Sequence, residues 1–284
     1  MYPNNLFEGI FPDNSLFSLT LYDICILIGI VAVFFLADRM TVKRGFSVTL
    51  QKIVIITAVI AIVVGYGSAV LFQAYYNFEA TGVFAITATT GATFFGGLIG
   101  GAAVFLIVWF LFAGRFCKDK DEPKKRFADI ADIAACCIPL AHGVGRIGCF
   151  FAGCCHGGET DAWYGVMMNG QKVVPLQLVE AAFLLALTAA LLALYYKNTG
   201  AKKFPLLPTY CLVYGVWRFF IEYARGDYRG ETFVSFLTPS QLIAVLLVAI
   251  GAAYFAIWWW RRKAAAKPLK TQETTEEIEE TKEK

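Results

Sequence analysis

The sequence predicts an all-α membrane protein with about seven transmembrane helices, from its composition, its long apolar segments and its charge pattern. Hydrophobic residues make up 58% of the 284-residue chain, charged residues only 17%, and the mean hydropathy is +0.59. Soluble domains contain roughly 45–50% apolar and about 25% charged residues. A soluble fold could not hide this apolar excess in its interior, whereas a bilayer requires an apolar outer surface.

Apolar segments of membrane-spanning length recur along the chain. A helix needs about 20 apolar residues to cross about 30 Å of hydrocarbon. Seven segments reach or approach this length, at residues 17–37, 53–76, 83–112, 130–151, 175–196, 204–223 and 237–260. We interpret the first as a retained span, because residues 1–16 lack the Lys and Arg of a cleavable signal peptide. The third is long enough to tilt, or to break at its glycines.

The connections between these segments alternate in charge. Lys and Arg concentrate in the first, third and fifth connections and directly after the last span, whereas the second and fourth hold mainly acidic residues. The sixth connection is mixed. Because basic loops face the cytoplasm, the pattern predicts an N-terminus outside and a C-terminus inside.

The chain divides into a membrane domain and a tail. Residues 1–263 are predicted to form one seven-span membrane domain. Residues 264–284 are rich in Glu, Thr and Lys and are predicted to form a disordered cytoplasmic tail. The net charge of +3 is too small to suggest a nucleic acid partner.

Two arginines, Arg146 and Arg218, lie inside apolar segments, each near the end predicted to face outward. An Arg at the centre of a membrane helix costs about 2.5–3.5 kcal/mol on insertion. Such residues usually face the bundle interior and mark a substrate path, and the planar guanidinium fork suits phosphate. We therefore predict a lipid-phosphate site. The alternative is that each Arg only extends along the helix to reach water.

Tyr214, Arg218 and Glu222 are spaced four residues apart, so on a helix they share one face. Glu222 either holds the Arg218 guanidinium or accepts a proton. The alternative is an ion pair that only makes the helix tolerable in lipid. Arg225 lies closer to water, and the alternative is that it is merely an interfacial residue.

Three of the eight cysteines form a polar, Gly-rich cluster. Cys149, Cys154 and Cys155 are followed by His156, whereas most other cysteines lie in apolar runs. Three interpretations stay open: a disulfide, a zinc site and a redox thiol pair. The adjacent pair Cys154-Cys155 departs from the usual zinc-ligand spacing. His142, on an apolar stretch, is predicted to be a packing residue.

Several of these segments together resemble the prolipoprotein diacylglyceryl transferase family. The matching motifs are Gly-Gly-Leu-Ile-Gly-Gly at 96–101, Gly-Arg-Ile-Gly at 145–148, Pro-x-Gln-Leu-x-Glu at 175–180 and Tyr-Gly-x-x-Arg-Phe-x-x-Glu at 214–222. Their order, the seven-span layout and the length agree with the family, so the resemblance covers nearly the whole chain.

The resemblance implies a reaction and its participants. The family transfers the diacylglyceryl group of phosphatidylglycerol to the lipobox Cys thiol of a prolipoprotein, in the bacterial cytoplasmic (inner) membrane and without a cofactor. Carried over, Arg146 and Arg218 stabilise the phosphate leaving group, Tyr214 helps to place the headgroup and Glu222 orients Arg218. The expected substrate-binding residues are Gly96, Gly97, Gly145, Gly148, Gln177 and Arg225.

The chain departs from the family pattern at the thiol-facing half of the site. The family's His before Gly-Gly-Leu-Ile-Gly is Phe95 here, and two Asn and one Glu are replaced by Cys149, Ala152 and Cys154. Two alternatives to diacylglyceryl transfer follow. One is a divergent member that uses Cys149, Cys154, Cys155 and His156 for metal binding, thiol redox chemistry or another acceptor. The other is a non-catalytic lipid-binding membrane protein.

Overall fold

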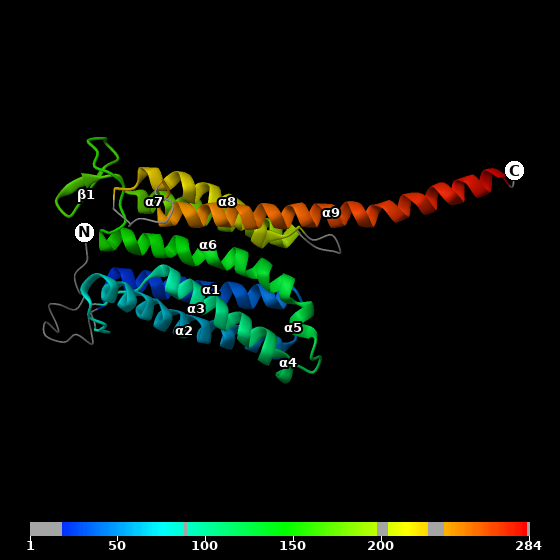
Figure 1. Ribbon diagram of the computed structural model, residues 1–284, viewed down its shortest axis with the longest axis horizontal. Coiled ribbons are helices and arrows are strands. Elements are labelled where there is room, and N and C mark those ends of the chain that lie inside the picture. The colour runs from blue at the N-terminus through cyan, green and yellow to red at the C-terminus, as the bar shows by residue number, and fades with distance from the viewer. Residues whose placement is uncertain (1–18, 88–89, 198–203, 227–235, 283–284) are drawn as a thin grey trace. The chain divides into compact units, whose positions relative to one another are not determined.

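The computed structural model describes residues 19–87, 90–197, 204–226 and 236–282, and nearly all of its regular structure is helical (Figure 1). It divides into two compact units, Met1–Ile30 with Ala134–Lys284, and Val31–Ile133.

The prediction of an all-α polytopic membrane protein is confirmed. Six helices in the described part of the chain are long and apolar enough to cross a membrane. They are Leu21–Lys43, Val48–Glu79, Gly96–Phe116, Phe127–Ala152, Leu176–Lys197 and Pro239–Lys263. The predicted span at 204–223 corresponds to α8 (Leu206–Ile221), which at 16 residues is shorter than the others and continues as the 3-10 turn η3 (Glu222–Ala224).

The third span differs from its prediction at its start, and its irregularity lies elsewhere than at the glycines. The apolar run begins at residue 83, but α3 (Phe94–Ile107) starts only after the extended cap residue Thr93. The glycines at 96–101 do not break it; the irregularity is the π-helical turn η2 (Val108–Phe112), which leads into the short α4 (Ala113–Phe116). These glycines lie close against a neighbouring helix, at positions where a larger side chain would not fit. The helical backbone continues through them without a break.

That neighbour is α2 (Val48–Thr81), and small residues set the distance between the two helices. A Cβ added at Gly96 would lie 2.7 Å from the Phe72 Cβ, and one at Gly100 would lie 2.4 Å from the Ser68 Cβ. The backbone N–H of Thr93 also donates to the Ala69 carbonyl at 3.1 Å. This is the small-residue packing by which membrane helices approach one another.

The basic connection of this unit is held by polar contacts. The short helix α5 (Glu122–Lys125) presents Glu122, whose carboxylate accepts from the backbone N–H of Ser47 at 3.0 Å and from its hydroxyl at 2.8 Å. The indole Nε1 of Trp109 donates to the Pro123 carbonyl at 3.1 Å. These bonds tie the start of α2 and the end of the third span to one loop.

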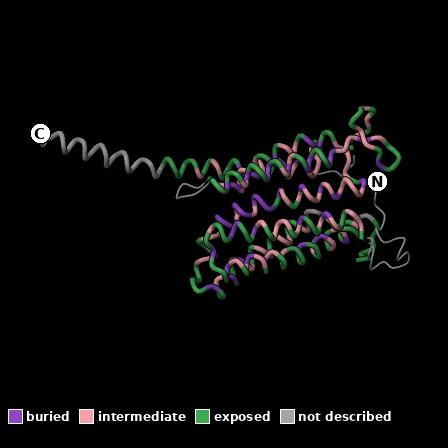
Figure 2. The backbone as a smooth tube through the Cα atoms, turned by 180° about the vertical axis from the view of Figure 1, so that it is seen from behind, coloured by how far each residue is buried: buried purple, intermediate pink, exposed green. Residues whose placement is uncertain are grey.

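The other unit contains the first turns of α1 (Leu21–Lys43), most of α6 (Phe127–Ala152), α7 (Leu176–Lys197), α8 and α9 (Pro239–Lys282). In Figure 1, α6 and α8 run in the same direction and α7 runs against them. Figure 2 shows buried positions recurring along α6 and α7. Gly215 and Gly251 bring α8 against α9: a Cβ at either would lie 2.8 Å from a side-chain carbon of the other helix.

The connection between α6 and α7 contains a β-hairpin that the sequence analysis had treated as a plain loop. Strand β1 (Val166–Met168) pairs antiparallel with β2 (Gln171–Val173). The turn residues Asn169 and Gly170 have φ values of 51° and 85°. Asn-Gly is the pair that best tolerates the two positive φ angles of a type I′ turn, so the signal was present in the sequence.

The C-terminal helix α9 extends to Lys282, but its membrane-length apolar part ends at Lys263. The side chains of residues 264–282 lie outside those described. The division into a membrane domain at 1–263 and a disordered tail at 264–284 stays a prediction.

Candidate active site

Four helix ends and two loops meet at one end of the larger unit. The chain leaving α6 pairs with the chain leaving α8 through an antiparallel bridge between Gly157 and Arg225. The backbone N–H of Gly157 donates to the Val174 carbonyl at 2.9 Å, just before α7. A Cβ on Gly157 would lie 2.9 Å from the Ala224 carbonyl oxygen, so only glycine fits this crossing. The ends of α6 and α8 are thereby fixed beside the start of α7.

Arg146 on α6 is paired with Glu180 on α7. Its Nε lies 3.0 Å from Glu180 Oε2, and its Nη2 donates to Glu180 Oε1 at 3.1 Å. Arg146 is 8% exposed and Glu180 only 1%. One hydrogen bond and one close ion contact hold the guanidinium, and the buried carboxylate supplies the opposite charge that a buried Arg requires.

Arg218 on α8 has partners in the 3-10 turn η3 that follows and at the start of α9. Its Nη2 lies 2.7 Å from Glu222 Oε2 and donates to the Ser240 hydroxyl at 2.7 Å. The second oxygen of Glu222 accepts from the Thr238 hydroxyl at 2.9 Å. The predicted pairing of Arg218 with Glu222 on one helix face is thus present, and the carboxylate is held in turn by a threonine.

The two arginines converge on one pair of rings. The His142 ring contacts the Tyr214 ring edge-on, with centroids 5.5 Å apart. Arg146 follows His142 by four residues on α6, and Arg218 follows Tyr214 by four residues on the co-directional α8. Accordingly, the charges of both guanidinium groups act on the His142 ring and on the Tyr214 hydroxyl. Two cationic groups from different helices therefore share one neighbourhood.

The Nη1 donor of Arg218 stands out in this neighbourhood. The Nη1 of Arg218 is buried and makes no hydrogen bond to any described residue. An unmet donor on a charged group costs free energy in a buried position, and an anionic ligand would satisfy it. The geometry therefore favours a bound anion beside Arg218.

The cysteine-rich turn begins where α6 ends. Gly153 adopts a left-handed φ of 68°, and the next backbone N–H, of Cys154, donates back to the Cys149 carbonyl at 3.2 Å. This is a common helix C-terminus, and it turns the chain back so that Cys154 lies beside Cys149. Cys155 has a φ of 62°, a conformation that is strained for a residue other than glycine and that occurs often at functional sites.

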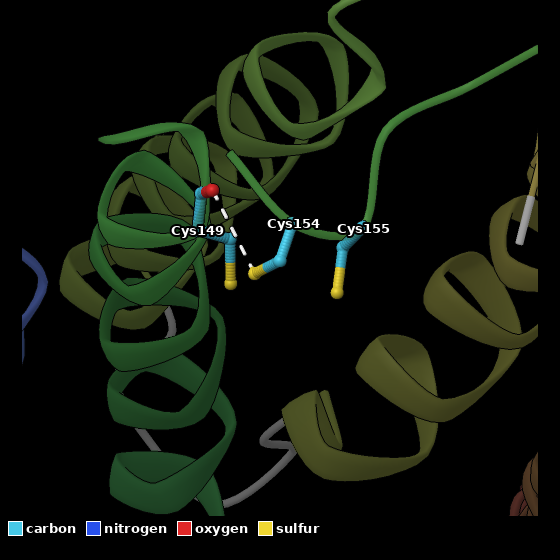
Figure 3. A group of neighbouring side chains, drawn as sticks. All are labelled: Cys149, Cys154 and Cys155. Atoms are coloured by element: carbon cyan, nitrogen blue, oxygen red, sulfur yellow. Dashed lines mark hydrogen bonds between the residues drawn. The ribbon is translucent and has the colours of Figure 1, made fainter. Parts of the chain in front are cut away.

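The sulfurs of Cys149, Cys154 and Cys155 all lie within 4.8 Å of one another. Figure 3 shows them on the same side of the turn, with the Cys154 Sγ also 3.7 Å from the Cys149 carbonyl oxygen. The pKa of the Cys154 thiol is raised: its contact with Cys149 lowers this pKa, but its contact with Cys155 and partial desolvation raise it more. His156, the fourth predicted member, is not part of this sulfur group; its Nδ1 lies 2.9 Å from the Gly157 carbonyl oxygen.

The residues predicted to bind substrate fall into two groups. Arg225 lies in the arginine neighbourhood, since its charge acts on Tyr214 and Arg146. Gln177 is fully buried, and its amide donates to the Cys154 carbonyl at 2.5 Å and contacts the Met168 sulfur at 3.6 Å. Gln177 thus supports the cysteine turn and the hairpin.

The predicted glycines serve helix packing. A Cβ on Gly148 would lie 3.1 Å from atoms of Tyr22 and Cys25 on α1, and one on Gly145 would lie 3.8 Å from Ile26. Gly96 and Gly97 belong to the Val31–Ile133 unit, where they pack on α2.

Sequence reasoning missed two members of the site. Glu180 had been noticed only as part of a motif, and its role as the Arg146 partner depends on the packing of α7 against α6. His142 had been assigned to packing, but it lies 3.7 Å from Glu180 Oε1 and against Tyr214. Its position one turn before Arg146 was the available signal.

Known proteins resemble this chain over most of its length. The family model described as prolipoprotein diacylglyceryl transferase matches residues 13–259. A Clostridium tetani protein named phosphatidylglycerol–prolipoprotein diacylglyceryl transferase is 30% identical over 244 residues, 83% of this chain and 92% of the relative. A Staphylococcus aureus protein of the same name is 31% identical over 242 residues, 81% of each chain. The second such transferase of Clostridium perfringens is 32% identical over 174 residues, 59% of this chain and 62% of the relative.

With the family model covering more than four fifths of its length, and with the motif arginines buried together, the chain belongs to the prolipoprotein diacylglyceryl transferase family.

Proposed function

We propose that this protein transfers the diacylglyceryl group of phosphatidylglycerol to the lipobox cysteine thiol of prolipoproteins, in the bacterial cytoplasmic membrane. The observation that carries the proposal is the convergence of Arg146 and Arg218 on His142 and Tyr214, with the Nη1 of Arg218 unsatisfied. The names of the relatives supply the two substrates.

The arginines are suited to the leaving group. The acceptor thiolate attacks the glyceryl carbon that carries the phosphate, the carbon–oxygen bond breaks, and glycerol phosphate leaves with the bond electrons. Negative charge therefore grows on the phosphate as the reaction proceeds. Arg146 and Arg218 are already oriented by Glu180 and Glu222, so they stabilise this charge without reorganising.

The surrounding groups place the lipid headgroup. The Tyr214 hydroxyl lies within electrostatic range of both guanidinium groups, and Arg225 adds a third positive charge. Because one arginine donor is buried, water is largely excluded from it, and its attraction for phosphate is stronger than in bulk solvent. The charge pattern of the loops supports an N-terminus outside and a C-terminus inside, which puts this end of the helices at the outer leaflet.

A reconstituted transfer assay tests the proposal. Purified protein in detergent, given phosphatidylglycerol and a lipobox peptide, is expected to form a thioether product and glycerol phosphate. Arg218→Ala is expected to lower the rate at least about 100-fold, since losing one donor to a developing charge costs about that much. Arg115→Ala, on α4 of the other unit, removes an arginine outside the site and serves as the matched control.

Two results would contradict the proposal. One is full activity of Arg218→Ala. The other is wild-type protein that binds phosphatidylglycerol but yields neither product, which would support the non-catalytic lipid-binding alternative.

A further inference from the structure

The cysteine turn presents three sulfurs in an arrangement that fits one metal ion. Tetrahedral zinc binds thiolates at about 2.3 Å, which places the sulfurs about 3.8 Å apart. Cys149, Cys154 and Cys155 hold their sulfurs within 4.8 Å of one another, so shifts of about 1 Å or less in side-chain position bring all three to one ion.

Hydrogen bonds from several other segments of the chain hold the cysteine turn in its shape. The Cys154 carbonyl accepts from the Gln177 amide at 2.5 Å, and the Gly153 carbonyl accepts from the Asn169 amide at 3.2 Å. The backbone N–H of Gly226 donates to the His156 carbonyl at 3.4 Å. Hydrogen bonds from residues that are not themselves ligands orient the ligands of a metal site before the metal binds. The left-handed backbone of Cys155 shows that the turn is held against local strain.

We propose that Cys149, Cys154 and Cys155 bind one zinc ion and that its fourth position takes the acceptor thiol. Three protein ligands with one exchangeable position are typical of catalytic zinc, whereas structural sites have four. His156, the nearest further candidate in sequence, is turned to the Gly157 carbonyl and leaves the fourth position open.

The site lies where such an ion would be useful, and this part of the inference rests on the proposed function. Cys149 and Cys155 lie within electrostatic range of the Arg146 guanidinium, so a metal ion held by these cysteines would be close to the phosphate-binding arginines. Three thiolates and a divalent ion carry a net negative charge, which is attracted by the Arg146 guanidinium that also pairs with Glu180.

The acceptor R–SH coordinates zinc and loses its proton to solvent, because coordination deprotonates a thiol. The zinc-bound sulfur then forms the bond to the glyceryl carbon while the carbon–oxygen bond to phosphate breaks. The products are the thioether, glycerol phosphate and one released proton; zinc stays divalent and nothing is oxidised or reduced.

Metal analysis of the full-length protein, purified under reducing conditions, tests the site without reference to activity. We expect about one zinc per chain, and a loss of at least about tenfold in zinc content in Cys149→Ala, Cys154→Ala and Cys155→Ala. Cys117→Ala, which removes a buried thiol of the other unit, is the matched control and should keep its zinc.

Wild-type protein provides a second measurement, in case a variant fails to fold. Added zinc should protect three thiols from maleimide, and removal of zinc by a chelator should restore their reactivity. A chain without zinc, three thiols equally reactive with and without zinc, or a disulfide among the three under these conditions would overturn the site.

The fourth position is tested by replacing zinc with cobalt and recording its absorption spectrum. A lipobox peptide should add a sulfur-to-cobalt band, and the same peptide with Ser in place of its Cys should not. An unchanged spectrum would overturn the role for the acceptor. Transfer at the full rate after zinc removal would also overturn this inference, but it would leave the proposed function intact. Zinc binding without any transfer would overturn only the proposed function.

Discussion

Arg146 and Glu180 form a buried ion pair between α6 and α7, with contacts of 3.0 and 3.1 Å joining the two side-chain ends. A single buried charge is unfavourable in an apolar helix, and each of these two side chains compensates the charge of the other. Arg146, the proposed phosphate ligand, is therefore positioned by a helix other than its own, and the same carboxylate lies 3.7 Å from His142.

Removing the carboxylate alone should destabilise the protein. Glu180→Leu leaves Arg146 buried with its charge uncompensated, which costs about 3–5 kcal/mol. Thermal unfolding in detergent should show a clearly lower midpoint, whereas Glu159→Gln, at an exposed acid of the connection between α6 and α7, should leave it unchanged. The double variant Arg146→Met with Glu180→Leu should recover most of the stability and none of the transfer activity. A stable Glu180→Leu single variant would contradict the pairing.

Arg218→Lys should separate charge from geometry. Lysine keeps the positive charge but lacks the planar fork, so it cannot hold Glu222 and Ser240 and also direct a donor at the phosphate. We expect kcat for transfer to fall about 100-fold with the fold retained. Ser240→Ala removes one partner of Arg218 and should lower kcat by no more than about tenfold. Equal rates for Arg218→Lys and wild type would show that charge alone suffices.

Gly96→Ala tests whether the glycine motif packs helices. The new Cβ would lie 2.7 Å from the Phe72 Cβ and 2.8 Å from the Ser68 carbonyl oxygen, so α2 and α3 must separate. We expect a loss of about 1–3 kcal/mol in unfolding free energy. Gly67→Ala, on α2 with nothing within 4 Å of the new Cβ, is the control and should be neutral or stabilising by up to about 1 kcal/mol. Similar stability changes for both variants would argue against a packing role.

Gly170→Ala should weaken the hairpin between α6 and α7. Gly170 has a φ of 85°, which alanine adopts only with strain, and the cost should be about 1 kcal/mol. Faster amide hydrogen exchange in residues 166–173 would report the effect. Gly158→Ala lies in the same connection with nothing within 4 Å of the new Cβ, and it should leave the exchange rates unchanged. Unaltered exchange in Gly170→Ala would mean that the turn adapts.

The sequence by itself determined the membrane class of the fold and the approximate positions of the helices. Apolar length is a local property, because each span must satisfy its own backbone within the bilayer. The i, i+4 pairing of Arg218 with Glu222 could be predicted for the same reason: Glu222 directly follows the helix that carries Arg218, and the spacing fixes their contact.

Only the tertiary structure decided which side chains meet across helices. The Arg146–Glu180 pair, the approach of His142 to Tyr214 and the gathering of three cysteine sulfurs depend on how α6, α7 and α8 pack and on the turn after Ala152. The start of α3 was misplaced because residues 83–87 are apolar without being helical, so hydropathy alone did not reveal it. The physical reason is common to all of these cases: hydropathy measures the environment of a segment, whereas a site depends on the direction of each side chain relative to groups on other helices.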